Sequence, residues 1–134
     1  MVGKAVERLD SLGKVLGHSI YTADMIPDNA LHMKLVRSSH PHAIIKSLNV
    51  SKAAHRRGVR AVITARDVPG TNVSSCIIPD RPLLAHGKVR CVGDIVAAVV
   101  ADNGEIAETA AKLVKVEYDP LPVITSPLIS MDPG

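Results

Sequence analysis

The chain contains no phenylalanine and no tryptophan, and prolines and glycines interrupt it throughout. Although 46% of its residues are hydrophobic, only two of them are tyrosines, so a core must be assembled from valine, alanine, isoleucine and leucine. With nine prolines and nine glycines, a coiled coil or a simple helical bundle is excluded. The pattern favours short strands joined by turns.

The length of 134 residues gives room for one domain with a core of its own. The longest apolar run covers residues 95–101, far short of the roughly 20 residues needed to cross a bilayer, so no membrane association is expected. The first residues lack the apolar stretch of a signal peptide, and two cysteines do not make a disulfide framework. We therefore expect a cytoplasmic protein with reduced thiols.

The net charge of +3 and the pI near 9.0 raise the question of nucleic-acid binding. Basic residues are scattered, however, with one short cluster at Arg56, Arg57 and Arg60 that suits a solvated helix end. Two tyrosines also offer few platforms on which bases could stack. We therefore expect no nucleic-acid partner.

Periodicity divides the chain into short elements. Residues 1–30 are expected to be irregular, because Gly13, Gly17 and Pro27 break any period. Alternating or continuous apolar residues predict six strands, with Leu31, Met33 and Leu35 sharing a buried face in the first of them. The predicted strands are 31–35, 43–50, 60–64, 89–92, 95–101 and 114–119, and the fifth should be buried on both faces.

Two helices are predicted between these strands. Ser51 is a suitable N-cap for a short helix through residue 57, and Gly58 can end it in the left-handed conformation. Asp102 and Glu105 have the spacing of a capping box for a second helix, in which apolar residues recur from 106 to 114. Between the two helices, residues 67–84 predict a long ordered loop, a feature that is often functional.

No catalytic or binding motif stands out. Gly13 and Gly17 do not have the spacing of a phosphate-binding loop, and His40 and His42 lack the further ligands of a zinc site. Neither Cys76 nor Cys91 can be placed against a base, and Cys91 is expected to be a small buried thiol within a strand. The remaining histidines are isolated in sequence. Residue chemistry alone indicates an α/β domain without a visible active site.

Five stretches in order resemble the N-terminal domain of the molybdenum-binding subunit in the xanthine dehydrogenase and aldehyde oxidase family. The resemblance extends over nearly the whole chain, from about residue 6 to residue 124. A departure is that Ser39 and Pro41 shift the family's usual proline by two places, which affects the local turn. The stretches are RLD, GKVLG and YTAD between residues 8 and 24, LVRSSHPHA at 35–43, GVRAVITARDVPG at 58–70, KVRCVGD at 88–94 and VKVEYDPLP at 114–122.

The resemblance implies an α+β fold, the α/β-hammerhead, with mixed short strands, two helices and one long loop. It implies a hammerhead domain over residues 1–124 and, at 125–134, a connection toward downstream molybdopterin-binding domains. Those domains and an iron–sulfur domain or subunit are the implied partners, in an oligomeric assembly. The whole enzyme would use molybdopterin, [2Fe-2S] clusters and often FAD to hydroxylate purines, N-heterocycles or aldehydes with water as the oxygen source.

No catalytic, cofactor-binding or metal-binding residue carries over, because the corresponding motifs belong to later domains of that subunit. By the same resemblance, Ile77 and Ile78 occupy positions that approach the substrate funnel, and we hypothesise that they form part of its apolar wall. The competing interpretation is that they only anchor the loop to the core. A second function is also open, a free-standing hammerhead-type module that binds a protein or a small anion.

Overall fold

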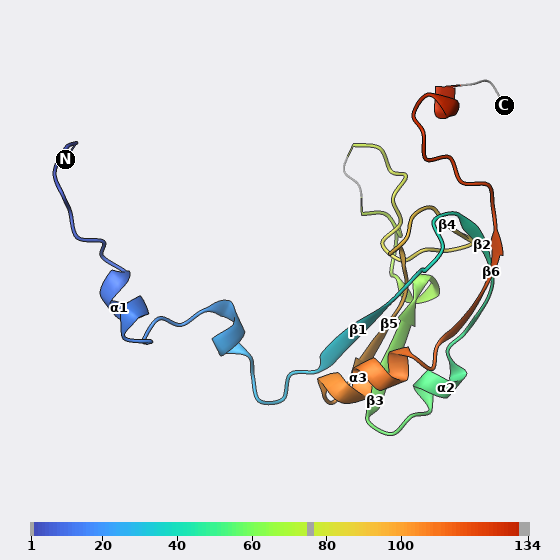
Figure 1. Cartoon of the computed structure of the whole chain (residues 1–134). Coiled ribbons are helices and arrows are strands. Elements are labelled where there is room, and N and C mark those ends of the chain that lie inside the picture. The colour runs from blue at the N-terminus through green and yellow to red at the C-terminus, as the bar shows by residue number, and fades with distance from the viewer. Residues whose placement is uncertain (1, 75–76, 132–134) are drawn as a thin grey trace. The chain divides into compact units, whose positions relative to one another are not determined.

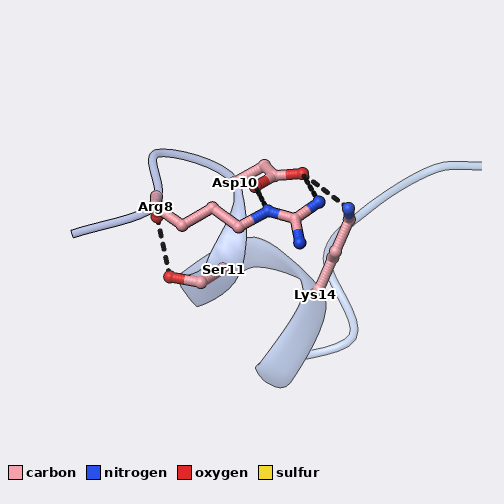
Figure 2. A network of polar contacts seen from close by, with 4 residues as sticks. All are labelled: Arg8, Asp10, Ser11 and Lys14. Atoms are coloured by element: carbon pink, nitrogen blue, oxygen red, sulfur yellow. Dashed lines mark hydrogen bonds and ion pairs between the residues drawn. The ribbon is translucent and has the colours of Figure 1, made fainter. Parts of the chain in front are cut away.

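The computed structural model describes residues 2–74 and 77–131, and the chain divides into two compact units, Met1–Ala30 and Leu31–Gly134 (Figure 1). The first unit holds two short helices, α1 (Ser11–Val15) and the 3-10 helix η1 (Thr22–Met25). The sequence pattern predicted no regular structure here, so neither helix was expected. Around α1, the Asp10 carboxylate accepts hydrogen bonds from Arg8 and Lys14, and these contacts lower the pKa of Asp10 (Figure 2).

Within the described residues, the second unit contains six strands in two antiparallel three-stranded sheets. The first sheet has the order β1 (His32–Arg37), β5 (Ile95–Ala101) and β3 (Val59–Thr64), and the second has the order β4 (Lys88–Val89), β2 (Ala43–Asn49) and β6 (Lys115–Pro120). Four helices accompany them: α2 (Ser51–Ala54), η2 (Ala65–Asp67), α3 (Gly104–Ala111) and η3 (Ile129–Met131). This confirms the predicted α+β class of mixed short strands.

The central strand of the first sheet, β5, is the most buried element. Val96, Ala97, Val99 and Ala101 have no exposed surface, as expected for a strand with a neighbour on each edge and cover on each face. The helix-facing core joins Val99 to small alanines of α2 and α3, whose size allows the helices to approach the sheet closely. A second core around Ala43, Ala85, Val89 and Val96 lies beside β2 and β6.

The face of β1 that was predicted to be buried is covered only at Leu35, which is partly buried, and His32 and Lys34 on the opposite face are exposed as well. The helix α3 covers the side of the strand that carries His32 and Lys34, and Lys34 forms an ion pair with Glu108 across 3.9 Å. Met33 is consequently 61% exposed and Leu31 53% exposed, although both were expected to be buried. Alternation identifies which side chains share a face of a strand, but the position of α3 decides which face is covered.

The two predicted helices form, but different residues cap them. Asn103 caps α3 by accepting a hydrogen bond from the backbone N–H of Ile106 at 2.8 Å, while Asp102 pairs with Arg60, so the predicted capping box is wrong. For α2 the cap residue is Val50 rather than Ser51. Gly58 has the expected left-handed backbone, with φ +85°, but α2 ends at Ala54 with His55 as its C-cap, so the prediction that Gly58 ends a helix running to residue 57 is wrong.

The predicted long loop is confirmed as a connection from residue 68 to residue 87 without helix or strand among its described residues. Asn72 closes the base of the loop by exchanging two hydrogen bonds with the Leu84 backbone, at 2.7 and 3.0 Å. The short strand β4 follows and ends at Val89, three residues before the predicted end. Cys76 lies outside the described residues.

Candidate functional site

Three of the family-like stretches meet at one end of the second sheet. We call residues 37–43, 88–94 and 118–122 the motif junction. Ala43 of β2 pairs with Val89 of β4 on one side and with Pro120 of β6 on the other, which brings the three stretches side by side. Sequence analysis identified these stretches separately, and only the register of the strands joins them.

Asp94 organises one side of the motif junction. Its carboxylate accepts hydrogen bonds from the backbone N–H of Arg90 at 2.7 Å and of Cys91 at 3.3 Å, and from the Cys91 thiol at 3.0 Å. The Asp94 backbone carbonyl accepts from the N–H of Ser38 at 2.8 Å, and the Ser38 carbonyl accepts from Gly93 at 2.9 Å. The turn after β4 is thereby fixed to the end of β1.

The Ser38 side chain extends this network toward the histidines. Ser38 is buried, and its hydroxyl donates to the carbonyl of His40 at 3.0 Å. The His40 ring lies 4.5 Å from the ring of Tyr118 on β6, whereas Nδ1 of His42 lies 2.6 Å from the carbonyl oxygen of Pro122. The two histidines therefore bind different partners within the junction.

The electrostatics of the motif junction suit a structural role. Burial acts to raise the pKa of Asp94, but the hydrogen bonds from Arg90 and Cys91 outweigh it, so the pKa is lowered and the carboxylate stays charged. The hydrogen bond to Asp94, followed by burial, raises the pKa of the Cys91 thiol. A thiol held protonated beside a carboxylate is a poor nucleophile.

Cys91 itself differs from its predicted state. It was expected to be buried in a strand, but it is exposed in the turn that follows β4. The reason is that the backbone N–H groups of Arg90 and Cys91 bind the Asp94 carboxylate, so that the chain turns instead of continuing along β2. In the described ranges, no three residues among histidine, cysteine, aspartate and glutamate gather as metal ligands.

A shallow groove lies beside the motif junction. It has a volume of about 320 Å³ and is lined by two cations, a histidine and apolar side chains. The lining residues are Pro41, His42, Lys88, Arg90, Pro122, Val123 and Ile124. Sequence analysis missed this groove, although Lys88 and Arg90, two apart in an extended segment, had the spacing of side chains that share a face.

The loop residues Ile77 and Ile78 are both exposed, to 91% and 63%. Their side chains therefore do not anchor the loop to the core, a task that Asn72 performs through the Leu84 backbone. The sequence-predicted pair thus lies apart from the buried clusters, on a segment closed at its base. When large apolar side chains with this exposure gather in a patch, the patch is typical of a surface that contacts another molecule.

The first sheet also presents an apolar face away from α2 and α3. The register places Met33, Leu35, Ala61, Ile63, Ala98 and Val100 on this side, and we call these six residues the open sheet face. Ala98 is buried, but Met33 is largely exposed and Leu35, Ile63 and Val100 are only partly buried. None of the helices in the described part of the chain is long and apolar enough to span a membrane.

Comparisons with known proteins identify the family of the chain. The family of the aldehyde oxidase and xanthine dehydrogenase a/b hammerhead domain matches residues 16–122. A probable xanthine dehydrogenase subunit of Bacillus subtilis is 45% identical over 127 residues, which are 95% of this chain and 17% of that protein. The large molybdopterin subunit of a nicotinate dehydrogenase from Eubacterium barkeri is 38% identical over 121 residues, 90% of this chain and 28% of the relative.

Solved structures give the same result. The aldehyde oxidoreductase from Desulfovibrio desulfuricans superposes with a TM-score of 0.86 at 33% identity, covering 98% of this chain and 16% of that structure's chain. The chain therefore spans less than a third of each of these relatives. The resemblance found in the five sequence stretches is confirmed. The chain belongs to the aldehyde oxidase and xanthine dehydrogenase family, in which it corresponds to the α/β-hammerhead domain.

Proposed function

We propose that the chain is a structural and interface domain of a molybdenum hydroxylase and that it has no activity alone. The complete enzyme is an oxidoreductase that hydroxylates purines, other N-heterocycles or aldehydes, with water as the oxygen source. Relatives described as a xanthine dehydrogenase, a nicotinate dehydrogenase and an aldehyde oxidoreductase support this range of substrates. Two cysteines do not make a disulfide framework, which supports a reducing compartment, the cytoplasm.

Under this proposal residues 1–124 form the hammerhead domain and residues 125–134 connect it to downstream molybdopterin-binding domains. The other partner is an iron–sulfur domain or subunit, within an oligomeric assembly. The small share of each relative that the chain spans supports further domains. So do the exposed apolar side chains after residue 124, such as Leu128 at 76% and Met131 at 79%.

The residues of this chain do not fit an iron–sulfur cluster. A [2Fe-2S] cluster takes four protein ligands, usually cysteines, and the chain has two cysteines. In the part of the chain that is described, histidine, cysteine, aspartate and glutamate do not gather in groups of three. We therefore assign the clusters to the rest of the enzyme. We also assign molybdopterin and any flavin there, because the resemblance places the molybdopterin ligands in later domains, and we assign no chemical step to this domain.

The observation that carries the proposal is the open sheet face. A contiguous apolar face with Met33 at 61% exposure is typical of a surface that another domain covers. In the complete enzyme, Met33→Asp would place an unpaired carboxylate in that contact, which costs about 3–5 kcal/mol when the charge is buried. We expect this domain to associate at least a hundredfold more weakly with the domain that covers the open sheet face, or the enzyme not to assemble.

The matched measurements separate assembly from folding. In the 134-residue chain, where Met33 faces solvent, the same substitution should change the free energy of unfolding by less than about 1 kcal/mol. Met33→Leu keeps the apolar contact and should leave both assembly and stability nearly unchanged. An assembled, fully active Met33→Asp enzyme would show that the open sheet face contacts no partner, and the proposal would lose its main support.

We also propose that Ile77 and Ile78 form part of the apolar wall of the substrate funnel in the complete enzyme. Replacing either with alanine should change substrate preference or KM by several-fold, since a few methyl groups in an apolar pocket are worth about 1–3 kcal/mol. Because both side chains are exposed here, the 134-residue chain should lose less than about 0.5 kcal/mol of stability. A loss of thermal stability with unchanged kinetics would contradict the funnel assignment.

The groove beside the motif junction favours a second candidate function, a free-standing module that binds a small anion. Lys88 and Arg90 face it together with His42, and no carboxylate lines it. Titration of the chain with inorganic phosphate and with benzoate, followed by calorimetry, tests this function. Binding that is lost in a Lys88→Ala, Arg90→Ala double variant, in a protein whose reading frame ends near residue 134, would favour the module over the enzyme domain.

A further inference from the structure

The second sheet has one edge that is only partly paired. β6 pairs with β2 along the whole strand, from Ala43 to Asn49, but β4 on the other edge pairs only with Ala43 and Ile44. The last contact on that edge is the hydrogen bond from the Ile45 N–H to the Gly87 carbonyl at 2.8 Å. Residues 46–49 have no further strand beside them in the described chain.

A register shift marks the point where this edge becomes open. Ile45 pairs with Tyr118 and Ser47 pairs with Glu117, so Lys46 is an extra residue in the ladder between β2 and β6. Such bulges commonly end pairing on one side of a strand. An open edge presents backbone N–H and C=O groups that can pair with another extended chain. Figure 1 shows β2 running on beside β6 after β4 has ended.

A groove of about 400 Å³ accompanies the open edge. Its lining combines the edge residues of β2 with the end of β3, the start of η2 and the end of the long loop. Much of the lining is apolar, with Ile45, Leu48 and Val50 on one side and Ala65 and Ala85 on the others. The complete lining is Ile45, Lys46, Ser47, Leu48, Val50, Thr64, Ala65, Arg66, Ala85, His86 and Gly87.

The ionisable side chains that line this groove are all basic. Lys46, Arg66 and His86 line it and no aspartate or glutamate does. Lys46 is paired with Asp119 at 3.3 Å, which leaves Arg66 as the cation without a carboxylate partner among the described ion pairs of the lining. The neighbouring Asp67 carboxylate is engaged by the N–H and hydroxyl of Thr64, at 2.7 and 2.8 Å.

We propose that the open edge of β2, at residues 46–49, binds an extended segment of a partner polypeptide as an added β-strand, with its apolar side chains in the groove and a carboxylate at Arg66. The backbone groups of the edge supply affinity, and the pockets for alternate side chains supply specificity. A second copy of this chain is disfavoured as the occupant. A two-fold symmetric contact at this edge would bring like cations together, which is destabilising.

The test uses defined peptides and the 134-residue chain. The probe is acetyl-Val-Glu-Val-Asp-Val-amide, and its control is acetyl-Val-Lys-Val-Lys-Val-amide, at millimolar concentration because short strands bind weakly. Hydrogen–deuterium exchange of the amides at residues 46–49 is the readout. We expect the acidic peptide to slow exchange there at least about threefold and the basic peptide to have little effect. Exchange at β5, the central strand of the other sheet, is the internal control.

Charge reversal at the groove completes the design. Arg66 is exposed, so Arg66→Glu should fold normally and should invert the preference, binding the basic peptide better. If Arg66→Glu does not fold, Arg66→Gln should weaken the acidic peptide several-fold instead. Equal slowing of amide exchange by both peptides would overturn the proposal, and so would exchange that neither peptide slows at any concentration. Self-association of the chain through residues 46–49, observed by sedimentation, would also overturn it.

Discussion

Removing the Asp94 carboxylate should destabilise the motif junction by an amount that its hydrogen bonds define. Asp94→Ala deletes the acceptor for the backbone N–H groups of Arg90 and Cys91 and for the Cys91 thiol. A hydrogen bond to a charged group is worth about 1.5–3 kcal/mol, but these donors lie near solvent and water can replace the carboxylate. We therefore expect a loss of about 2 kcal/mol and a fall in Tm of roughly 8 °C.

The pH dependence follows from the direction of the pKa shift. The folded-state pKa of Asp94 lies below its ordinary value of 3.8, so the group binds fewer protons in the folded chain than in the unfolded chain. Its contribution to stability is complete above pH 3.8 and is lost as the pH falls through the lowered pKa. The difference in the free energy of unfolding between the wild-type chain and Asp94→Ala should therefore become smaller in acid.

Urea unfolding followed by circular dichroism at pH 7 and at pH 3 measures this difference. Asp94→Asn, which keeps one carbonyl acceptor for the backbone N–H groups, should lose about half as much stability as the alanine variant. Asp80→Ala removes an exposed carboxylate of the loop and controls for the change of net charge. A loss below 0.5 kcal/mol for Asp94→Ala (an amount typical of ordinary surface substitutions), or a difference that grows in acid, would refute the reasoning.

Three further predictions concern the fold that supports the junction. Gly58→Ala and Gly70→Ala both place a side chain at positive φ, which should lower the free energy of unfolding by about 1 kcal/mol. Gly58→Ala should lose about 1 kcal/mol more, measured by urea unfolding, because its Cβ would lie 2.7 Å from an isoleucine of α3. Gly70 has open space around the added Cβ. Asn103→Ala should lose about 1 kcal/mol and fray α3 by hydrogen exchange, while Asp102→Ala should leave the helix intact. Val99→Ala, at a site without exposed surface, should lose about 2–3 kcal/mol in the same assay.

Local sequence patterns were sufficient for the elements that depend on local chemistry. The strand at 95–101 was predictable because a continuous β-branched and alanine run must be buried, and the positive φ of Gly58 because glycine adopts a left-handed backbone without steric cost. The long loop followed from its prolines and glycines. In each case the residue types of the element itself are sufficient for the prediction.

The remaining features depend on contacts between distant residues. Asp102 and Asn103 are both good helix caps, and the choice falls to Asn103 because Arg60, 42 residues away, binds Asp102. The exposed face of β1 depends on where α3 packs, and the exposure of Cys91 depends on the Asp94 turn. α1 is a single short turn that buries no residue, so its sequence has no apolar periodicity from which a helix could be predicted.

The candidate site shows the same division. Ile77 and Ile78 were identified by resemblance alone, since nothing in their local pattern distinguishes them from other loop isoleucines. The motif junction could be recognised as separate stretches but not assembled, because the strand register that brings 37–43, 88–94 and 118–122 together is a tertiary property. The open edge of β2 is likewise visible only once β4 is known to be two residues long.

The central claim is that this domain supports chemistry that other domains perform. The most direct measurement is made on the purified 134-residue chain, with xanthine, nicotinate and an aldehyde as substrates, a dye as electron acceptor, and elemental analysis for molybdenum. The account predicts no turnover above background and no stoichiometric metal. Turnover of any of these substrates, or a molybdenum content approaching one per chain, would contradict it.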